Sequence, residues 1–561
     1  MNFWSRHRSR LKLDAYDVAL LAGFAALSVW PVVLLSSKAG PDHIWTGTDG
    51  LFLGDQMQYL GWIQNAARHI LVSDPFRTNP GPADYLHPGL VISGLLVRMG
   101  VSPANAYLAW KPIAVVALFL AARAYIARLP ISRSQSRFAL GLALFYASPV
   151  TFFAASLHWL PAQDRYFLPT VGTEMWPGVY LWGYPFTAIS VAALAFCLLA
   201  YERDRELRVV RPWAPLLGLL CAWLQPWQGG TVLGVLVVSE AIMWFRNDRG
   251  RPALLVATTV ATALPLFYYA ALSHFDPTWA LSGRQNLTVV PMLAVLAVLI
   301  PLGLPALLAY RLRPLNYLAV TVRTWPIVAL GVYLLIAVSH VGTYPLHALQ
   351  GLSIPFAGLA VIGVSGLHLR GSDAAKAAIG VAVVACIVLP STWQNFAKVR
   401  SLGDRTVYGQ QPYFITSGEQ QALDYLKRDR LTGSVLAPVY LGQTVPAETG
   451  RQSWVGIFSW TPNYAQRVAF ADALFSGMLS STKAEALIRT SGARFLLADC
   501  QHRNARVAVP RADLVSIHHF GCATVFQLAS ATSNSLLTSP IADRMPSPAP
   551  GPDRRSRVWA S

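Results

Sequence analysis

Long apolar segments recur through roughly the first 390 residues, separated by short polar gaps. Many approach or exceed the ~18 residues that a helix needs to cross a bilayer. This pattern predicts a polytopic α-helical membrane protein with about eleven transmembrane helices. The expected spans are residues 17–36, 104–127, 138–157, 182–201, 213–227, 231–245, 252–272, 287–309, 325–340, 349–367 and 377–391.

Two apolar segments depart from this simple pattern. Residues 213–245 contain QPWQGG at their centre. They predict two short helices joined by a tight turn at Pro226 and Gly229–Gly230, because Pro and Gly interrupt helices. Residues 88–99 (PGLVISGLLVRM) are apolar but too short to span, so we expect an interfacial or re-entrant helix there.

The chain becomes more polar after the last apolar segment. Strand-like runs (SVLAPVY, ARFLLADC, CATVFQL) alternate with helical patterns (GEQQALDYLKRD, YAQRVAFADALFSGM, STKAEALIRTSG). Residues 1–395 are therefore predicted to form the transmembrane domain, and residues 396–530 a small α/β domain. The last segment, residues 531–561, is rich in Ser, Pro and Ala and is predicted to be disordered.

Composition and charge placement support a membrane protein. Hydrophobic residues make up 54% of the chain and charged residues 13%, with a net charge of +18. The basic residues gather in alternate gaps, as the positive-inside rule requires, and form no basic stripe interleaved with aromatics. We therefore expect no nucleic-acid partner, a cytoplasmic N-terminus and an extracytoplasmic C-terminal domain in the plasma or inner membrane. The gaps predicted to be cytoplasmic contain Arg128, Arg133, Arg137, Arg203, Arg205, Arg208, Arg211, Arg246, Arg249, Arg251, Arg311, Arg313, Arg323, Arg370 and Lys376.

The first external loop, residues 37–103, is long and acidic. Apolar positions between residues 56 and 71 recur at helical spacing and predict an amphipathic surface helix. Asp55 stands at its expected N-cap, a role worth about 1 kcal/mol. Alternatively, Asp55 or Asp49 is a catalytic base at the membrane–water boundary; for Asp55 the two roles are compatible.

Other external polar residues are candidates for substrate contacts. The second external loop contains Asp164 and Glu174 among aromatic residues such as Trp176. Together with His87 of the first loop, these three are candidates for acceptor binding. A divalent cation held by Asp164, Glu174 and first-loop carboxylates is a second interpretation, and the metal remains open.

External cations suit an anionic lipid phosphate. Arg284 lies in SHFDPTWALSGRQN, and His340 and His347 flank the segment HVGTYPLHALQG. These three are the candidates for donor-phosphate binding. The alternative for Arg284 is snorkelling to lipid headgroups, and the alternative for the histidines is a structural role.

The C-terminal domain shows no catalytic motif. Its segment VPAETGRQSWVG contains Glu448, Arg451 and Trp454 and suits either a sugar site or an ordinary loop. Cys500 and Cys522 form a disulfide if this domain faces an oxidising compartment, although spacing alone does not decide the pairing. The remaining cysteines, expected to pack as small hydrophobic residues, are Cys197, Cys221 and Cys386.

The layout resembles the GT-C superfamily of membrane glycosyltransferases. The likeness lies in TDGLFLGDQMQYLGW, which contains Asp49 and Asp55, and in TYPLHALQGLSIPFAGLAV. The chain departs from the adjacent Asp-Glu pair of protein O-mannosyltransferases and from oligosaccharyltransferase motifs. The resemblance implies a polyprenyl-phosphate-linked sugar donor, a cell-envelope glycan, lipid or protein acceptor, and one inverting displacement with a first-loop Asp as general base.

Two other functions remain open at this stage. A transporter or lipid flippase predicts charged residues paired near mid-membrane and broken helices in matching halves of the chain. QPWQGG is a broken helix without a counterpart. A non-catalytic envelope assembly protein predicts a C-terminal domain that binds a partner.

Overall fold

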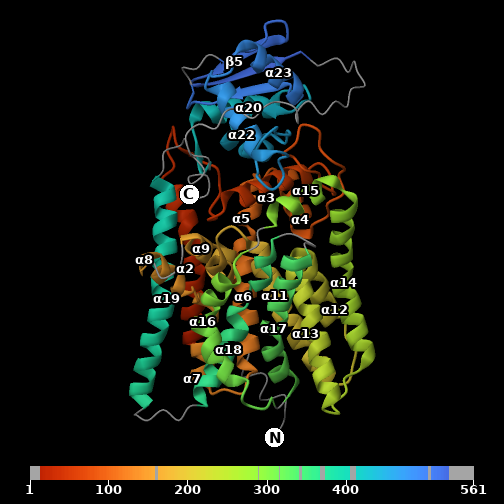
Figure 1. Cartoon of the computed structure of the whole chain (residues 1–561), viewed down its shortest axis with the longest axis vertical. Helices are drawn as coiled ribbons and strands as arrows, with labels where there is room; N and C mark the ends of the chain where they lie inside the picture. Colours follow the sequence, from red (N-terminus) through yellow and green to blue (C-terminus); the bar gives the residue numbers. More distant parts are fainter. Residues whose placement is uncertain are drawn as a thin grey trace.

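A bundle of helices carries a smaller domain at one end (Figure 1). The computed structural model describes residues 13–157, 162–287, 290–314, 316–339, 344–366, 373–404, 412–502 and 507–529. The predicted disordered tail, residues 531–561, lies outside this described part.

Each of the eleven predicted spans overlaps at least one helix of the bundle, but fewer than eleven of the described helices are long enough to span. In the described part of the chain, eight helical segments are long and apolar enough to cross a membrane, which makes this a multi-pass membrane protein. The predicted spans 138–157, 213–227 and 349–367 fall on shorter helices. The bundle helices are α2 (Ala15–Ser37), α6 (Trp110–Ala127), α7 (Arg133–Phe145), α11 (Pro185–Glu206), α12 (Trp213–Leu224), α13 (Pro226–Phe245), α14 (Pro252–Phe275), α16 (Met292–Ala309), α17 (Tyr317–Ser339), α18 (Ser353–Ser365) and α19 (Asp373–Asp404).

Proline positions correct two predicted spans. The span 138–157 is divided into α7 and α8 (Pro149–Leu157), since α8 begins at a proline. The turn expected over QPWQGG is confined to Gln225, and α13 begins at Pro226. Gly229 lies inside α13, where it allows a close helix contact: an added Cβ would lie 2.5 Å from the Cβ of Ala222.

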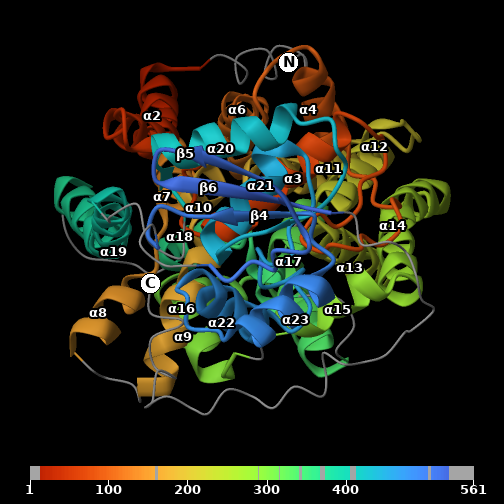
Figure 2. The ribbon, with the colours of Figure 1, turned by 90° about the horizontal axis from the view of Figure 1, so that it is seen from above.

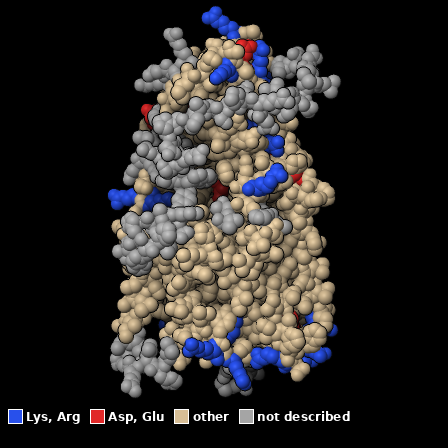
Figure 3. All heavy atoms as spheres, viewed as in Figure 1, with Lys and Arg blue, Asp and Glu red and all other residues tan. Residues whose placement is uncertain are grey.

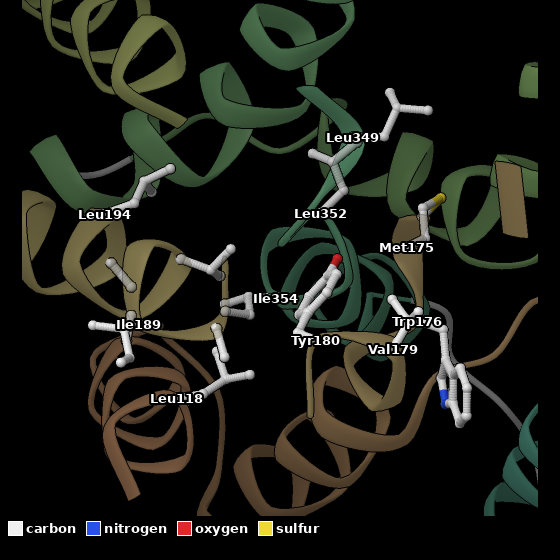
Figure 4. Packing of buried hydrophobic residues seen from close by; sticks show 14 of the residues in the cluster. Leu118, Met175, Trp176, Val179, Tyr180, Ile189, Leu194, Leu349, Leu352 and Ile354 are labelled. Atoms are coloured by element: carbon white, nitrogen blue, oxygen red, sulfur yellow. The ribbon is translucent and has the colours of Figure 1, made fainter. Parts of the chain in front are cut away.

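Buried side chains from distant segments fill the centre of the bundle. Figure 4 shows Leu118 of α6, Val179 and Tyr180 of α10 (Pro177–Leu181), and Ile189 of α11 beside the segment that leads into α18. Burying one such aliphatic side chain contributes roughly 1.5–3 kcal/mol. The short helices α10 and η1 (Pro345–Leu349) are thereby held on the bundle's core.

The first external loop contains short helices that lie across the end of the bundle. They are α3 (Leu53–Ala66), α4 (Pro88–Arg98) and α5 (Pro103–Leu108). The helix predicted over residues 88–99 is therefore confirmed as α4. The predicted surface helix is α3, but its N-cap is Phe52, so Asp55 lies in the first turn and is not the N-cap.

The C-terminal domain is a small α/β fold, as the sequence predicts. Its four-stranded sheet has the order β3-β4-β6-β5; β3 and β4 are parallel and the other pairs antiparallel. The strands are β3 (Val435–Leu436), β4 (Phe495–Ala498), β5 (Leu514–Phe520) and β6 (Ala523–Leu528). The helices are α20 (Ser417–Arg428), α21 (Val439–Thr449), α22 (Tyr464–Phe475) and α23 (Ser481–Ser491).

This domain is docked on the first external loop. Strand β1 (Ile44–Trp45) pairs antiparallel with β2 (Phe414–Ile415). This pairing connects the first external loop to the beginning of the C-terminal domain. α21 packs against α3, and Trp460 donates a hydrogen bond from Nε1 to Oε1 of Gln58 over 2.6 Å. Seen from above, the sheet lies over the bundle and α19 lies at its periphery (Figure 2). The domain therefore covers α3.

Two of the five cysteines form a disulfide and three are free. Cys500 and Cys522 form a disulfide, the pairing that the sequence left open. Cys197 and Cys221 are buried as predicted. Cys386 is exposed, which corrects the prediction, because α19 packs on few neighbouring helices and leaves much of its surface free.

The VPAETGRQSWVG segment has a structural role in the fold. Its first residues belong to α21. Arg451 donates hydrogen bonds to the carbonyl oxygens of Leu426, Asp429 and Leu431, and its guanidinium lies over the Phe495 ring. The guanidinium is therefore engaged by the backbone of its own domain.

Basic side chains gather at the end of the bundle opposite the C-terminal domain, below a belt that is largely free of charge (Figure 3). The polar gaps after α6, α11, α13 and α16 contain the arginines that the sequence places on one side of the membrane. In the same view, the surface is hollowed between the bundle and the domain, and acidic atoms are visible in the recess.

Candidate functional site

Asp55 is the acidic residue around which the candidate site is built. It projects from the first turn of α3, and its Oδ2 accepts a hydrogen bond from the hydroxyl of Tyr184 over 2.6 Å. Tyr184 is the N-cap of α11, so the contact joins the external loop to a bundle helix. The hydrogen bond fixes one carboxylate oxygen of Asp55 and leaves the other available.

The charge environment of Asp55 suits a base at neutral pH. Burial raises the pKa of Asp55 above its ordinary value. The hydrogen bond from Tyr184 and the nearby His347 lower this pKa, and the nearby Glu174 raises it. A carboxylate with a raised pKa is the usual form of a catalytic general base.

Glu174 and His347 form a directly bonded pair beside Asp55. Oε2 of Glu174 lies 3.0 Å from Nδ1 of His347, and it accepts a second hydrogen bond from Nε2 of Gln350 over 2.7 Å. Glu174 lies near the end of α9 (Ala162–Met175), whereas the other two residues lie in and just after η1. The pair thus links two external segments that are distant in sequence.

Local sequence fixes these two segments relative to each other. Tyr180 of α10 donates a hydrogen bond from its hydroxyl to the carbonyl oxygen of Glu174 and accepts one from the N–H of Gly351 over 2.9 Å. Gly351 has φ +81°, a conformation that glycine adopts without strain. Gln228 of α13 donates to the carbonyl oxygen of His347 over 2.9 Å, which holds η1 from the other side.

Asp49 lies in a different environment from Asp55. Its side chain is buried and forms an ion pair with Lys111 of α6. Its Oδ1 also accepts a hydrogen bond from Nε2 of Gln56 over 2.8 Å, and Oε1 of Gln56 accepts from the N–H groups of Asp49 and Gly50. Asp49 therefore anchors the start of the external loop to the bundle.

The remaining predicted residues are not all brought together. His87 caps α4 and is buried; burial lowers its pKa to about 4, so its imidazole is neutral at pH 7. Trp176 is buried against Trp182 at a ring-centroid distance of 4.7 Å. Arg284 is exposed in the last turn of α15 (Pro277–Asn286). His340 and the side chain of Asp164 lie outside the described part.

The residues that the structure describes do not form a metal-binding cluster. Among these residues, no group of three or more His, Cys, Asp or Glu side chains is arranged to hold a metal ion. Glu174 instead uses Oε2 to accept from Gln350 and to contact His347. We therefore derive no catalytic step through a metal.

Sequence reasoning missed the uncharged members of this site. Tyr184, Gln350 and Gln228 make direct hydrogen bonds to the site residues or their backbone. Polar side chains at the ends of apolar segments were the only signal for them, because Tyr and Gln are ordinary at membrane boundaries.

No family model and no curated protein matches this sequence. Its structure does match solved membrane glycosyltransferases. The apo oligosaccharyltransferase of Archaeoglobus fulgidus aligns over 93% of this chain and 75% of its own, at 11% identity and a TM-score of 0.50. Arabinofuranosyltransferase AftD from Mycobacteria aligns over 90% of this chain and 41% of its own, at 14% identity and a TM-score of 0.47.

A third similar structure is ArnT from Cupriavidus metallidurans bound to undecaprenyl phosphate. It aligns over 92% of this chain and 98% of its own, at 12% identity and a TM-score of 0.42. Identities this low relate the chains by fold alone, and the oligosaccharyltransferase has the highest of these three TM-scores. Over most of its length, this chain shares its fold with the Archaeoglobus fulgidus oligosaccharyltransferase.

Proposed function

We propose that this protein is a membrane glycosyltransferase that moves a sugar from a polyprenyl-phosphate-linked donor to a cell-envelope acceptor. The observation that carries this proposal is the position of Asp55: a carboxylate at the end of the bundle, bonded to Tyr184 and close enough to Glu174 and His347 for their charges to act on it. A base beside a cationic or hydrogen-bonding group is what an inverting transfer from an anionic donor requires.

In the proposed reaction, Asp55 takes the proton of the acceptor hydroxyl as its oxygen attacks the anomeric carbon. The bond from that carbon to the phosphate oxygen breaks, and the lipid phosphate leaves with the electron pair. General-base assistance of this kind contributes roughly 10²–10⁴-fold. His347 is proposed to contact the phosphate. Asp55 is preferred to Asp49 as the base because Lys111 and Gln56 already engage Asp49.

The roles of the other predicted residues remain proposals. Arg284 is exposed on α15, below the C-terminal domain, where its guanidinium is free to meet a lipid phosphate. His87 and Trp176 are buried, so an acceptor role for them requires that the site opens. Asp164 and His340 remain candidates for acceptor and donor contact, respectively.

The site is proposed to face the extracytoplasmic side. Two observations support this orientation. Arginines gather at the opposite end of the bundle, as expected for a cytoplasmic face (Figure 3). The Cys500–Cys522 disulfide lies in the domain on the site's side, and disulfides persist in oxidising compartments.

The test is transfer by the purified full-length chain in nanodiscs. A panel of synthetic polyprenyl-phosphate hexoses and pentoses is supplied with envelope glycan, lipid and peptide acceptors. We expect release of polyprenyl phosphate and a glycosylated product with one donor class, and loss of both with Asp55→Asn. Asp513→Asn, a change in a surface Asp–Arg pair of the C-terminal domain, is the matched control and should retain activity.

An alternative outcome of the same experiment is informative. If the protein moves lipid-linked sugars or other lipids between leaflets of proteoliposomes without releasing polyprenyl phosphate, it is a flippase and the transferase proposal is wrong. If neither activity is found with any donor, the assembly-protein interpretation is favoured.

A further inference from the structure

Glu174 does not face the external space as a free acceptor-binding group. Both contacts of its side chain use Oε2: one is with Nδ1 of His347 at 3.0 Å, and the other is with Nε2 of Gln350 at 2.7 Å. Its side chain is only 8% exposed. A carboxylate that is buried and bonded in this way acts through its partners.

Of the two ring nitrogens of His347, only Nδ1 has partners among the described residues, namely Oε2 of Glu174 and Nε2 of Gln350. A carboxylate accepts hydrogen bonds and does not donate them, so Nδ1 of His347 carries a hydrogen toward Glu174. The rings of Trp227 and Tyr344 lie against the imidazole at centroid distances of 4.7 and 4.8 Å. The second ring nitrogen, Nε2, has no hydrogen-bond partner among the described residues, and the side chain is 23% exposed.

A further polar atom beside this pair lacks a partner. Gln228 is 1% exposed; its Nε2 donates to the carbonyl oxygen of His347, but its Oε1 is buried without a hydrogen bond among the described residues. Buried polar atoms are seldom left unpaired unless a water or ligand completes them. Nε2 of His347, on a partly exposed side chain, is therefore available to a bound molecule, whereas the buried Oε1 of Gln228 can be completed only by a water or another hydrogen-bond donor.

We propose that Glu174 is a positioning residue that orients His347 so that Nε2 meets the phosphate of the lipid-linked donor. This inference rests on the proposed function and deepens it, because it reassigns Glu174 from the acceptor to the donor side of the site. In the imidazolium form both ring nitrogens carry hydrogen, so Nδ1 donates to Glu174 while Nε2 donates to the leaving phosphate and stabilises its charge. Asp55 works at the acceptor. Gln350 supports the carboxylate in this arrangement.

The charged and titratable groups around His347 are few. Glu174 of α9 contacts it, the Tyr344 ring of its own segment lies against it, and Asp55 of α3 is near enough to interact with it electrostatically. α13 contributes the uncharged Gln228 and Trp227. Residues 328–339, the half of α17 next to η1, contain no charged residue. Removal of Glu174 therefore changes the orientation of His347 without exposing it to another carboxylate on α13 or α17.

The test compares Glu174→Gln, His347→Gln and the double variant in the full-length protein. Two quantities are measured for each: kcat with the active donor, and the Kd of farnesyl phosphate, a probe that contains the lipid phosphate and no sugar. We expect His347→Gln to lower kcat by on the order of 10²-fold and Glu174→Gln by roughly 10–100-fold. Both should weaken farnesyl phosphate binding and leave the acceptor KM within about twofold.

The double variant separates positioning from folding. If Glu174 works through His347, the double variant is no slower than His347→Gln alone, because the two changes remove one interaction. Independent losses that multiply, with an altered acceptor KM, would overturn the inference. Full activity of Glu174→Gln would overturn it as well.

The chain supplies a matched control. His502 and Asp499 in the C-terminal domain form a second histidine–carboxylate pair with the same 3.0 Å contact and a similar exposed fraction of the histidine, 24%. His502→Gln should change neither kcat nor farnesyl phosphate binding. If the wild-type protein transfers no sugar, the proposed function fails, whereas farnesyl phosphate binding still tests the role of Glu174.

Discussion

The hydroxyl of Tyr184 donates a 2.6 Å hydrogen bond to Oδ2 of Asp55. This contact joins the first turn of an external helix to the start of a bundle helix. It fixes the carboxylate next to the Glu174–His347 pair, and it stabilises the charged form of a buried acid. The proposed chemistry depends on this arrangement.

Tyr184→Phe should move the acid limb of the pH–rate profile to higher pH. Burial already raises the pKa of Asp55, and the Tyr184 hydrogen bond lowers it. Loss of that bond therefore raises the pKa further, and a base is active only when deprotonated. The profile of kcat/KM against pH checks this. An acid limb that stays in place, or moves to lower pH, would contradict the assignment of Asp55 as the base.

Asp49→Asn should lower the free energy of unfolding strongly and reduce the turnover of the folded protein only slightly. Removing one partner of a buried ion pair costs on the order of 3–5 kcal/mol, because Lys111 is left uncompensated. The double change Asp49→Asn with Lys111→Met should recover much of the lost stability. Thermal unfolding and the turnover of the folded fraction are measured together. Wild-type stability of Asp49→Asn combined with a lost turnover would instead favour Asp49 as the base.

Asp74→Asn should stabilise the protein several times more at pH 8 than at pH 5. Burial raises the pKa of Asp74 to about 7, despite the hydrogen bond from the N–H of Phe76. Because the folded-state pKa lies above the unfolded value, the stability that Asp74 contributes is present at low pH and is lost as pH rises toward 7.

Each unit of pKa shift corresponds to about 1.4 kcal/mol, so a pKa raised by about 3 predicts a gain on the order of 4 kcal/mol at pH 8. Unfolding temperatures of the wild-type and Asp74→Asn proteins at both pH values test this. A variant that is less stable than wild type at pH 8 would show that Asp74 is charged and paired there, with Arg77 or Arg467 as the nearby cations.

Replacing Cys500 and Cys522 by Ala should destabilise the C-terminal domain by roughly 3 kcal/mol, because the bond closes a loop between residues 22 positions apart. Added reductant should produce a similar loss in the wild-type protein and none in the variant. Limited proteolysis with and without reductant measures this. Equal protease resistance in all samples would mean that the disulfide contributes little.

The sequence predicted the architecture well because hydrophobic length is a direct consequence of bilayer thickness. Each predicted span overlaps at least one helix, and proline positions account for the differences at α8 and α13. Helix α21 was missed, since Val439, Val445 and Pro446 lower helix propensity. Its packing on α3 is a tertiary interaction that local sequence does not report.

The site was predictable only in its charged members. Asp55, Glu174 and His347 were candidates because ionisable groups are costly near hydrocarbon. Their pairing was not predictable, since it depends on Tyr180 and Gly351 bringing α9 and η1 together. For the same reason, the sequence did not distinguish Asp55 from Asp49: the difference lies in Lys111, more than fifty residues away.

The most direct test of the central claim is the turnover of Asp55→Asn in the purified protein, at saturating donor and acceptor. The account predicts a loss in kcat of roughly 10²–10⁴-fold. Farnesyl phosphate binding and the unfolding temperature should remain close to those of the wild type. Turnover within a fewfold of wild type would show that Asp55 is not the base.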